Sequence, residues 1–270
     1  MIHIDINQEQ IPALGFGTYR LKGKDCRDAV TDAISLGYRH IDTARMYDNE
    51  AEVGRGIRDS SVNRDDVFVT TKIWYTDLAR QDIIHGLEDS LRQLQTDYVN
   101  LTLIHWPTPE MNLEESLGAL MELQQQGKTR LIGVSNFPSA LLKEALSIAP
   151  IVCNQVEYHP YLAQDALLDI AQKRRLMLTA FCPLAKGEVL QDNKLKQIGE
   201  KYGKSAAQIT LRWLVQQENV VAIPKAASRE HRVTNLDIFD FSLTEDEMSQ
   251  IHQLNRNHRL SNPSWAPVWD

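Results

Sequence analysis

The rest of the chain is arranged around the segment Arg39-His40-Ile41-Asp42-Thr43-Ala44-Arg45-Met46-Tyr47-Asp48-Asn49-Glu50. Residues 38–42 read as a short strand, and the next helix is expected to begin near Asn49, with Glu52 completing a capping pair. Asp42 then ends a strand and Tyr47 lies in the following loop. A carboxylate and a phenol held so close can share one acid–base pocket. Taken alone, residues of these types more often serve as a helix cap and a surface tyrosine.

Composition narrows the possible classes. The chain has 270 residues and a net charge of −7, without long runs of one sign, which argues against nucleic-acid and membrane partners. The first residues contain no basic and apolar segments of a signal peptide, and no apolar stretch approaches membrane-spanning length. The three cysteines, Cys26, Cys153 and Cys182, are odd in number and widely spaced. We therefore expect a cytoplasmic globular protein.

The start of the chain predicts a small β-hairpin. Ile2, Ile4 and Ile6 alternate with polar residues before a turn at 7–10. The apolar stretch 11–18 follows as a strand, and its glycines, Gly15 and Gly17, indicate that another part of the molecule approaches the backbone closely.

From there helices and strands alternate. The pattern predicts strands at 11–18, 38–42, 67–72, 98–105, 130–136, 151–156, 176–181 and 220–225. It predicts helices near 25–36, 50–60, 82–95, 114–126, 139–147, 164–174, 192–202, 205–217, 229–239 and 244–254. Several strands are near-continuous apolar runs, as expected of parallel strands buried on both faces.

Eight strands, each followed by helix, predict an α/β fold of the (β/α)₈ TIM-barrel type, forming a single domain over residues 1–270. The barrel carries the N-terminal β-hairpin and a short C-terminal tail. A doubly wound sheet is the rival architecture. It calls for a G-x-G-x-x-G turn, and the segment from Gly15 to Arg20 lacks the third glycine.

Polar groups gather at the predicted strand ends, where barrels place their chemistry. The ends in order are Asp42, Lys72, His105, Ser135-Asn136, Gln155, Phe181-Cys182 and Lys225. A polar residue at one strand end can be explained simply by exposure of the barrel rim to solvent. Several groups of complementary chemistry on neighbouring strands make that explanation weaker.

These groups suit the reduction of a carbonyl. Hydride addition leaves an alkoxide that needs a proton, and Tyr47 can supply it if its pKa, ordinarily about 10, is brought down. Lys72 is placed to lower that pKa, Asp42 can pair with Lys72, and His105 can hold the carbonyl oxygen. A metal site involving His40 and Asp42 is the alternative, but the further histidine and carboxylate ligands are missing, so we expect no metal.

Taken together, these motifs resemble the aldo-keto reductase family from residue 11 to residue 236. The matching segments are 15–18, Asp42-Thr43-Ala44-x-x-Tyr47-x-Asn49-Glu50, Thr71-Lys72, 103–107, 133–137, 154–157 and Ile223-Pro224-Lys225. The resemblance implies a catalytic tetrad of Asp42, Tyr47, Lys72 and His105, with Tyr47 as proton donor. A non-catalytic nicotinamide-binding subunit, redox-sensing or structural, is the alternative from another class.

The resemblance also implies a nicotinamide cofactor bound without a Rossmann domain. Ser135, Asn136 and Gln155 would hold the carboxamide, Phe181 would stack on the ring, and the segment 182–186 would cover the pyrophosphate. The implied cofactor-binding residues are Gly17, Thr18, Asp42, Ser135, Asn136, Gln155, Phe181, Cys182, Leu184, Lys225, Ala226, Arg229 and Asn235.

Coenzyme choice rests on the segment after the last strand. The family usually binds a 2′-phosphate with Lys-Ser and an arginine six positions after that lysine. Here Lys225 is kept, Ala226 lacks the hydroxyl, and His231 replaces the arginine. Arg229 or Arg232 could supply the missing charge, and Glu230 is the one carboxylate expected nearby. We expect NADPH over NADH, by a narrower margin than is usual in the family.

The implied substrates are small polar carbonyl compounds. The short chain and its ending resemble the bacterial branch that reduces 2,5-diketo-D-gluconate or methylglyoxal. Short loops would leave an open pocket formed by Tyr47, Trp74, His105, Trp106 and Trp265. We expect a monomer.

Overall fold

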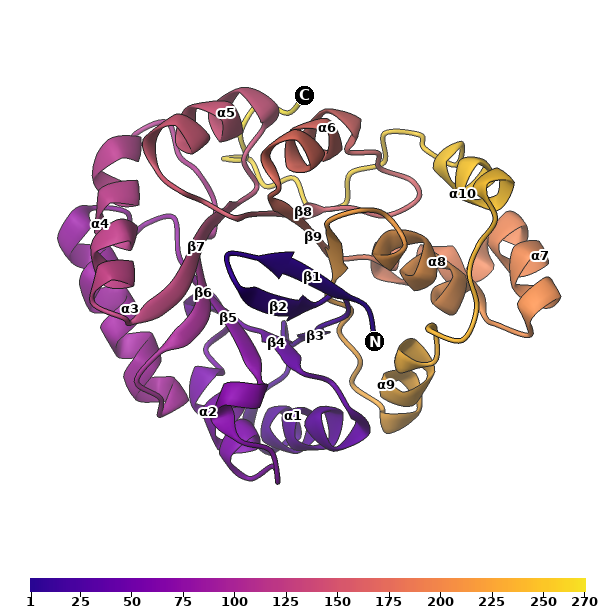
Figure 1. Ribbon diagram of the computed structural model, residues 1–270, viewed down its shortest axis with the longest axis horizontal. Helices are drawn as coiled ribbons and strands as arrows, with labels where there is room; N and C mark the ends of the chain where they lie inside the picture. The colour runs from indigo at the N-terminus through magenta and orange to yellow at the C-terminus, as the bar shows by residue number, and fades with distance from the viewer.

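The computed structural model describes residues 1–270 and contains an eight-stranded parallel sheet in the order β10-β9-β8-β7-β6-β5-β4-β3. Its helices surround the sheet (Figure 1). The strands are β3 (Phe16–Gly17), β4 (His40–Asp42), β5 (Phe68–Ile73), β6 (Val99–Ile104), β7 (Thr129–Ser135), β8 (Cys153–Glu157), β9 (Met177–Phe181) and β10 (Val220–Ala222). The predicted barrel architecture is confirmed.

The helices follow the predicted alternation within a few residues at each end. They are α1 (Gly23–Leu36), α2 (Glu50–Arg58), α3 (Arg80–Leu94), α4 (Leu113–Gln125), α5 (Ser139–Ile148), α6 (Asp165–Arg174), α7 (Asn193–Tyr202), α8 (Ala206–Val215), α9 (Arg229–Leu236) and α10 (Glu245–His252). Short 3₁₀ turns occur at η1 (Arg45–Tyr47), η2 (Arg64–Asp66) and η3 (Ala185–Gln191). No helix is both long enough and apolar enough to span a membrane.

The last and first strands meet to close the barrel. Leu14 forms a parallel bridge with Ala222, and the Gly15 amide donates to the Ala222 carbonyl at 2.8 Å. A Cβ on Gly17 would lie 2.8 Å from the Ile223 carbonyl oxygen, too close for any side chain. Gly17 is therefore required because the backbone after β10 passes directly against it. The close approach predicted at this glycine is the seam of the barrel.

The N-terminal hairpin closes the amino-terminal end of the barrel (Figure 1). It pairs β1 (His3–Ile6) with β2 (Glu9–Pro12) in antiparallel register. Its apolar residues join a cluster of inward-facing strand residues that includes Ile4, Ile6, Ile11, Phe68, Leu101, Met177 and Val221. Because one end is plugged by these side chains, only the carboxyl ends of the strands are open to a ligand.

Two predictions about this region are wrong. The stretch 11–18 is not one strand: it is divided between the end of β2 and the two-residue β3, because the chain first serves the hairpin and then the barrel. Asn49 precedes α2, but its side chain does not cap the helix. Its amide donates to the Thr18 and Leu21 carbonyls at 2.9 and 3.0 Å and accepts from the Thr43 hydroxyl at 2.8 Å. Asn49 therefore ties together the loops after β3 and β4.

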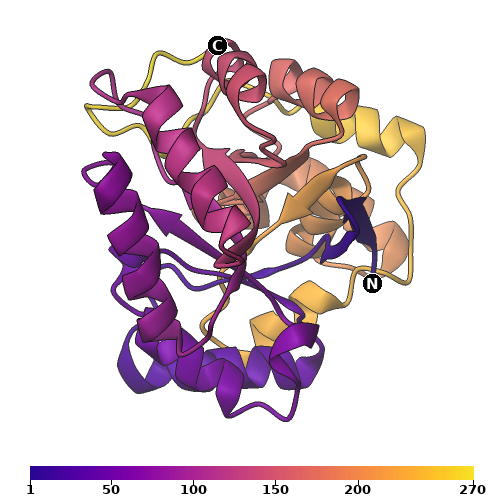
Figure 2. The ribbon, with the colours of Figure 1, turned by 60° about the vertical axis from the view of Figure 1, so that its left-hand side comes forward.

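The chain after α10 contains no helix or strand and runs across the carboxyl end of the barrel (Figure 2). Buried Glu157, the last residue of β8, accepts hydrogen bonds from the backbone amides of Leu260 and Ser261, both at 2.7 Å. The Asp270 carboxylate accepts from the amide and hydroxyl of Ser139 at 2.9 and 2.6 Å. We refer to residues 253–270 as the tail.

Candidate active site

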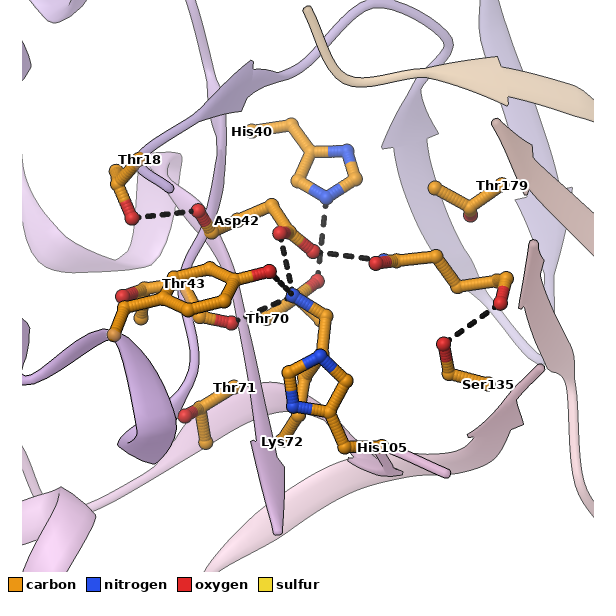
Figure 3. A network of polar contacts seen from close by, with 12 residues as sticks. Thr18, His40, Asp42, Thr43, Thr70, Thr71, Lys72, His105, Ser135 and Thr179 are labelled. Atoms are coloured by element: carbon orange, nitrogen blue, oxygen red, sulfur yellow. Dashed lines mark hydrogen bonds and ion pairs between the residues drawn. The ribbon is translucent and has the colours of Figure 1, made fainter. Parts of the chain in front are cut away.

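Four predicted residues come from three neighbouring strands and the segments that follow them. Asp42 ends β4, Tyr47 ends η1, Lys72 lies in β5, and His105 follows β6 directly. The strands run parallel, so their carboxyl ends meet at one rim. The side chains of Asp42, Lys72 and His105 converge in Figure 3, with the lysine ammonium at the centre of the polar contacts.

The Lys72 ammonium contacts three oxygen atoms. Its Nζ lies 2.6 Å from Asp42 Oδ1, 2.8 Å from the Thr43 carbonyl oxygen and 3.3 Å from the Tyr47 hydroxyl. The other carboxylate oxygen of Asp42 accepts from the Gln155 side-chain amide at 2.8 Å. The Lys72 and Asp42 side chains are 0% and 2% exposed. A buried ammonium thus reaches the phenol while its own charge is balanced.

The environment holds Lys72 charged and Tyr47 protonated. Burial by itself would lower the pKa of Lys72, but the Asp42 carboxylate and then the Tyr47 phenol outweigh it, so the net pKa is raised. Burial raises the pKa of Tyr47, and the Lys72 ammonium offsets only part of that rise. The expectation of a lowered tyrosine pKa is therefore wrong for the protein alone. A neutral phenol beside an ammonium is the correct starting state for a proton donor.

The imidazole of His105 faces Tyr47, with ring centroids 5.8 Å apart. Burial, followed by the charge of Lys72, lowers the pKa of His105 well below its usual value, so the ring is neutral. Its Nδ1 is buried and has no hydrogen-bond partner. Buried polar atoms normally find partners, so this one points to a ligand.

A second histidine below the site predicts acid sensitivity of the fold. Burial lowers the pKa of His40 from about 6.5 to about 4. Between these values the unfolded chain binds the extra proton, so stability falls as pH falls, by up to about 3 kcal/mol for His40. The slope of unfolding free energy against pH in this window should flatten in His40→Gln. His3→Gln, at an exposed histidine, is the matched control and should not change that slope. The same slope in His40→Gln as in the wild type would contradict the prediction.

An aromatic wall stands beside the buried cluster. The ring of Trp74 lies 4.9 Å from that of His105, and the Trp265 ring lies 5.8 Å from Trp74, 4.2 Å from Tyr75 and 5.1 Å from Trp106. Trp265 belongs to the tail, so a segment distant in sequence completes the wall. The three tryptophans predicted for the pocket do lie together. Tyr75 was missed because nothing in its local sequence distinguishes it from a surface tyrosine.

The predicted amide-binding residues form a second polar group next to Asp42. The Ser135 hydroxyl donates to the Gln155 carbonyl at 2.7 Å, and the Asn136 side-chain amide donates to the His105 carbonyl at 3.0 Å. Asn136 adopts a left-handed backbone conformation with φ of 63°, and its Oδ1 is buried without a partner. A buried acceptor that no protein group satisfies fits the NH₂ of a nicotinamide carboxamide.

The segment predicted to cover the cofactor follows β9. Phe181 is half-buried at the end of the strand, and Cys182, Ala185 and Lys186 all have positive φ, so the chain turns sharply there. The Lys186 ammonium donates to the Leu260 carbonyl at 2.9 Å, which joins this segment to the tail. All three cysteines, including Cys182, are free.

The segment after β10 differs from expectation in one respect. Lys225 is exposed and Asn235 is buried, but Arg229 and Arg232 both pair with Asp32 of α1. The expectation that Glu230 is the one carboxylate nearby is therefore wrong. Sequence reasoning missed Asp32 because it lies almost 200 residues away on another helix, with no local signal.

No group of three or more histidine, cysteine, aspartate or glutamate side chains lies close enough to bind a metal ion.

The chain belongs to the aldo/keto reductase family, whose sequence profile matches residues 13–256. Among its relatives is the methylglyoxal reductase DkgB of Yersinia pestis, 40% identical over 266 residues, which cover 96% of this chain and 99% of that protein. The glyoxal reductase of Bacillus subtilis is 41% identical over 257 residues, covering 94% and 92% of the two chains. A crystal structure provisionally assigned to 2,5-diketo-D-gluconic acid reductase B superposes with a TM-score of 0.97 at 44% identity, covering 100% of this chain and 98% of that one.

Proposed function

We propose that this protein is an NADPH-dependent reductase of small polar aldehydes and ketones, including methylglyoxal and 2,5-diketo-D-gluconate. Its membership of the aldo/keto reductase family supports carbonyl reduction in general. The observation that supports catalysis with Tyr47 as proton donor is the contact of its hydroxyl, at 3.3 Å, with the buried Lys72 ammonium, whose charge Asp42 balances. The names of the relatives support the substrate class.

Proton delivery is assigned to Tyr47. The bound cofactor supplies the hydride, and the carbonyl oxygen that gains negative charge needs a proton. Tyr47 gives up its proton beside the Lys72 ammonium, which stabilises the phenolate left behind. Asp42 keeps that ammonium charged and in place through its 2.6 Å contact. Neutral His105 would donate a hydrogen bond to the carbonyl oxygen and thereby orient it.

Cofactor binding is assigned to the amide group beside Asp42 and to the segments after β9 and β10. Ser135, Asn136 and Gln155 would hold the carboxamide, because Asn136 presents a buried, unpaired acceptor there. The other residues proposed to contact the cofactor are Gly17, Thr18, Phe181, Cys182, Leu184, Lys225, Ala226, Arg229 and Asn235. The substrate would lie against Trp74, Trp106 and Trp265.

The proposal is tested by mixing the purified protein with NADPH and methylglyoxal and following the absorbance of the cofactor. A panel of aldehydes, dicarbonyls and keto-sugars then ranks the substrates. Tight NADPH binding without turnover of any member of the panel would replace the proposal with the non-catalytic alternative. The cytoplasmic location, the monomeric state and the single domain over residues 1–270 stay predictions.

Coenzyme preference provides a direct quantitative prediction. We expect kcat/KM with NADPH to exceed that with NADH for the same substrate, because Lys225 lies after β10 with its side chain exposed. Each charge-assisted contact with a phosphate contributes about 1.5–3 kcal/mol, and the chain lacks two that the family usually has, so the preference should be modest. Equal or higher kcat/KM with NADH would contradict this prediction.

A further inference from the structure

Asp32 joins two neighbouring helices through a cluster of three charges. The helices α1 and α9 lie side by side (Figures 1 and 2), and the Asp32 carboxylate accepts from Arg232 Nε at 2.7 Å and contacts Arg229 Nη1. Arg232 is 8% exposed and also donates to the Ala226 and Ala227 carbonyls at 3.0 and 2.8 Å. Arg232 therefore fixes the backbone after β10, while the 61% exposed Arg229 has only its pairing with Asp32.

This pairing matters for an anionic ligand. The backbone braced by Arg232 is the segment that, on the proposed function, receives the 2′-phosphate of NADPH. Arg229 is the first residue of α9 and lies next to that segment in the chain. A phosphate that approached Arg229 would compete with the Asp32 carboxylate for the guanidinium and be repelled by it, since like charges at short range disfavour each other.

We infer that Asp32 is a coenzyme-specificity residue, which weakens the preference for the 2′-phosphorylated cofactor by occupying Arg229. The inference rests on the proposed function and adds to it a residue on α1, outside the segment from Lys225 to Asn235. Asp32 acts on the ligand through Arg229, so it is a positioning residue. A purely structural role, holding α1 against α9, would affect the binding of phosphorylated and unphosphorylated cofactors equally.

The test is a double-mutant cycle on affinity, which needs no turnover. Asp32→Asn removes the charge but keeps an oxygen that can accept from Arg232. Dissociation constants for NADP⁺ and NAD⁺ are measured by calorimetry in the wild type, Asp32→Asn, Arg229→Ala and the double variant. We expect Asp32→Asn to tighten NADP⁺ by about fivefold, the scale of one exposed charge interaction, and to change NAD⁺ by less than about twofold.

The gain should depend on the arginine. Arg229→Ala should weaken NADP⁺ binding by less than about twofold in the wild type, because the Asp32 carboxylate already offsets much of the guanidinium charge that the phosphate would meet. It should abolish the gain in Asp32→Asn, because that gain comes from the guanidinium that Asp32 no longer offsets. Added salt should reduce the gain, as screening requires. Asp28→Asn is the matched control: it removes the same charge one turn earlier on α1, where Asp28 pairs with Lys24, and should leave the ratio of the two affinities unchanged.

Several outcomes would overturn the inference. An unchanged NADP⁺-to-NAD⁺ ratio in Asp32→Asn, or a gain that persists without Arg229, would exclude the role of the ion pair. If the wild type still reduces methylglyoxal with NADPH, the proposed function survives that result. A wild-type protein that binds neither dinucleotide would end both the inference and the proposed function.

Discussion

Replacement of Tyr47 by phenylalanine should reduce turnover by about 10²- to 10⁴-fold, the usual contribution of a general acid. The change removes only the hydroxyl that Lys72 contacts at 3.3 Å, so the ring, its packing on His105 and the binding of NADPH should persist. Two measurements are required: kcat for a carbonyl substrate at saturating NADPH, and the dissociation constant of NADPH by fluorescence titration.

A neighbouring tyrosine provides the control for this prediction. The ring of Tyr19 lies 5.0 Å from that of Tyr47, but Tyr19 is 45% exposed and its hydroxyl makes no contact with Lys72. Tyr19→Phe should keep most of the wild-type turnover. If Tyr47→Phe retained more than about a tenth of wild-type turnover, the proton would have another source and the assignment would be wrong.

Replacement of Lys72 by methionine should abolish activity and also destabilise the fold. It leaves the buried Asp42 carboxylate without its cation, a loss that typically costs about 3–5 kcal/mol. The Gln155 amide still donates to that carboxylate, but a neutral donor does not replace a charge. Denaturant unfolding at neutral pH would measure the loss, and turnover would fall because no ammonium stabilises the phenolate.

A second substitution separates the lost pair from a generally poor fit of methionine. Asp42→Asn combined with Lys72→Met removes both charges, so the double variant should be more stable than Lys72→Met alone. Lys173→Met is the matched control, because Lys173 pairs with Asp169 at 2.7 Å and the two side chains are 71% and 58% exposed; it should cost at most about 1 kcal/mol. Equal or lower stability of the double variant would show that the two charges do not compensate each other.

Much of the barrel could be predicted from sequence because its signals are local. The buried apolar residues of α3, including Ile83, Leu87 and Leu91, follow the period of a helix. The strands β9 and β10 are buried almost throughout, as their near-continuous apolar runs indicated. The weakest prediction was the stretch 11–18. A two-residue strand such as β3 has no periodicity of its own, and its position is set by pairing with β4 and by the seam at Gly17.

The site divides in the same way. Asp42, Lys72 and His105 could be found because each ends or follows an apolar strand, and parallel strand ends meet at one rim. The direction of the pKa shift of Tyr47 could not be predicted from sequence, because it depends on how completely the phenol is buried. The role of Asn49 and the contact of Asp32 with Arg229 depend on loops and helices that meet only in the folded chain.

The attachment of the tail by Glu157 has an evolutionary consequence. The groups proposed to move the proton belong to β4, β5 and the segments beside them. Trp265, in contrast, stands on the tail, whose contacts with the barrel include the Leu260 and Ser261 amides on Glu157, the Lys186 hydrogen bond to the Leu260 carbonyl and the Asp270 contact with Ser139. The tail sequence can therefore diverge at little cost to the chemistry, as long as its backbone still reaches Glu157. Substrate range and catalytic power are then inherited separately, and exchanging residues 262–269 between relatives should transfer the first without the second.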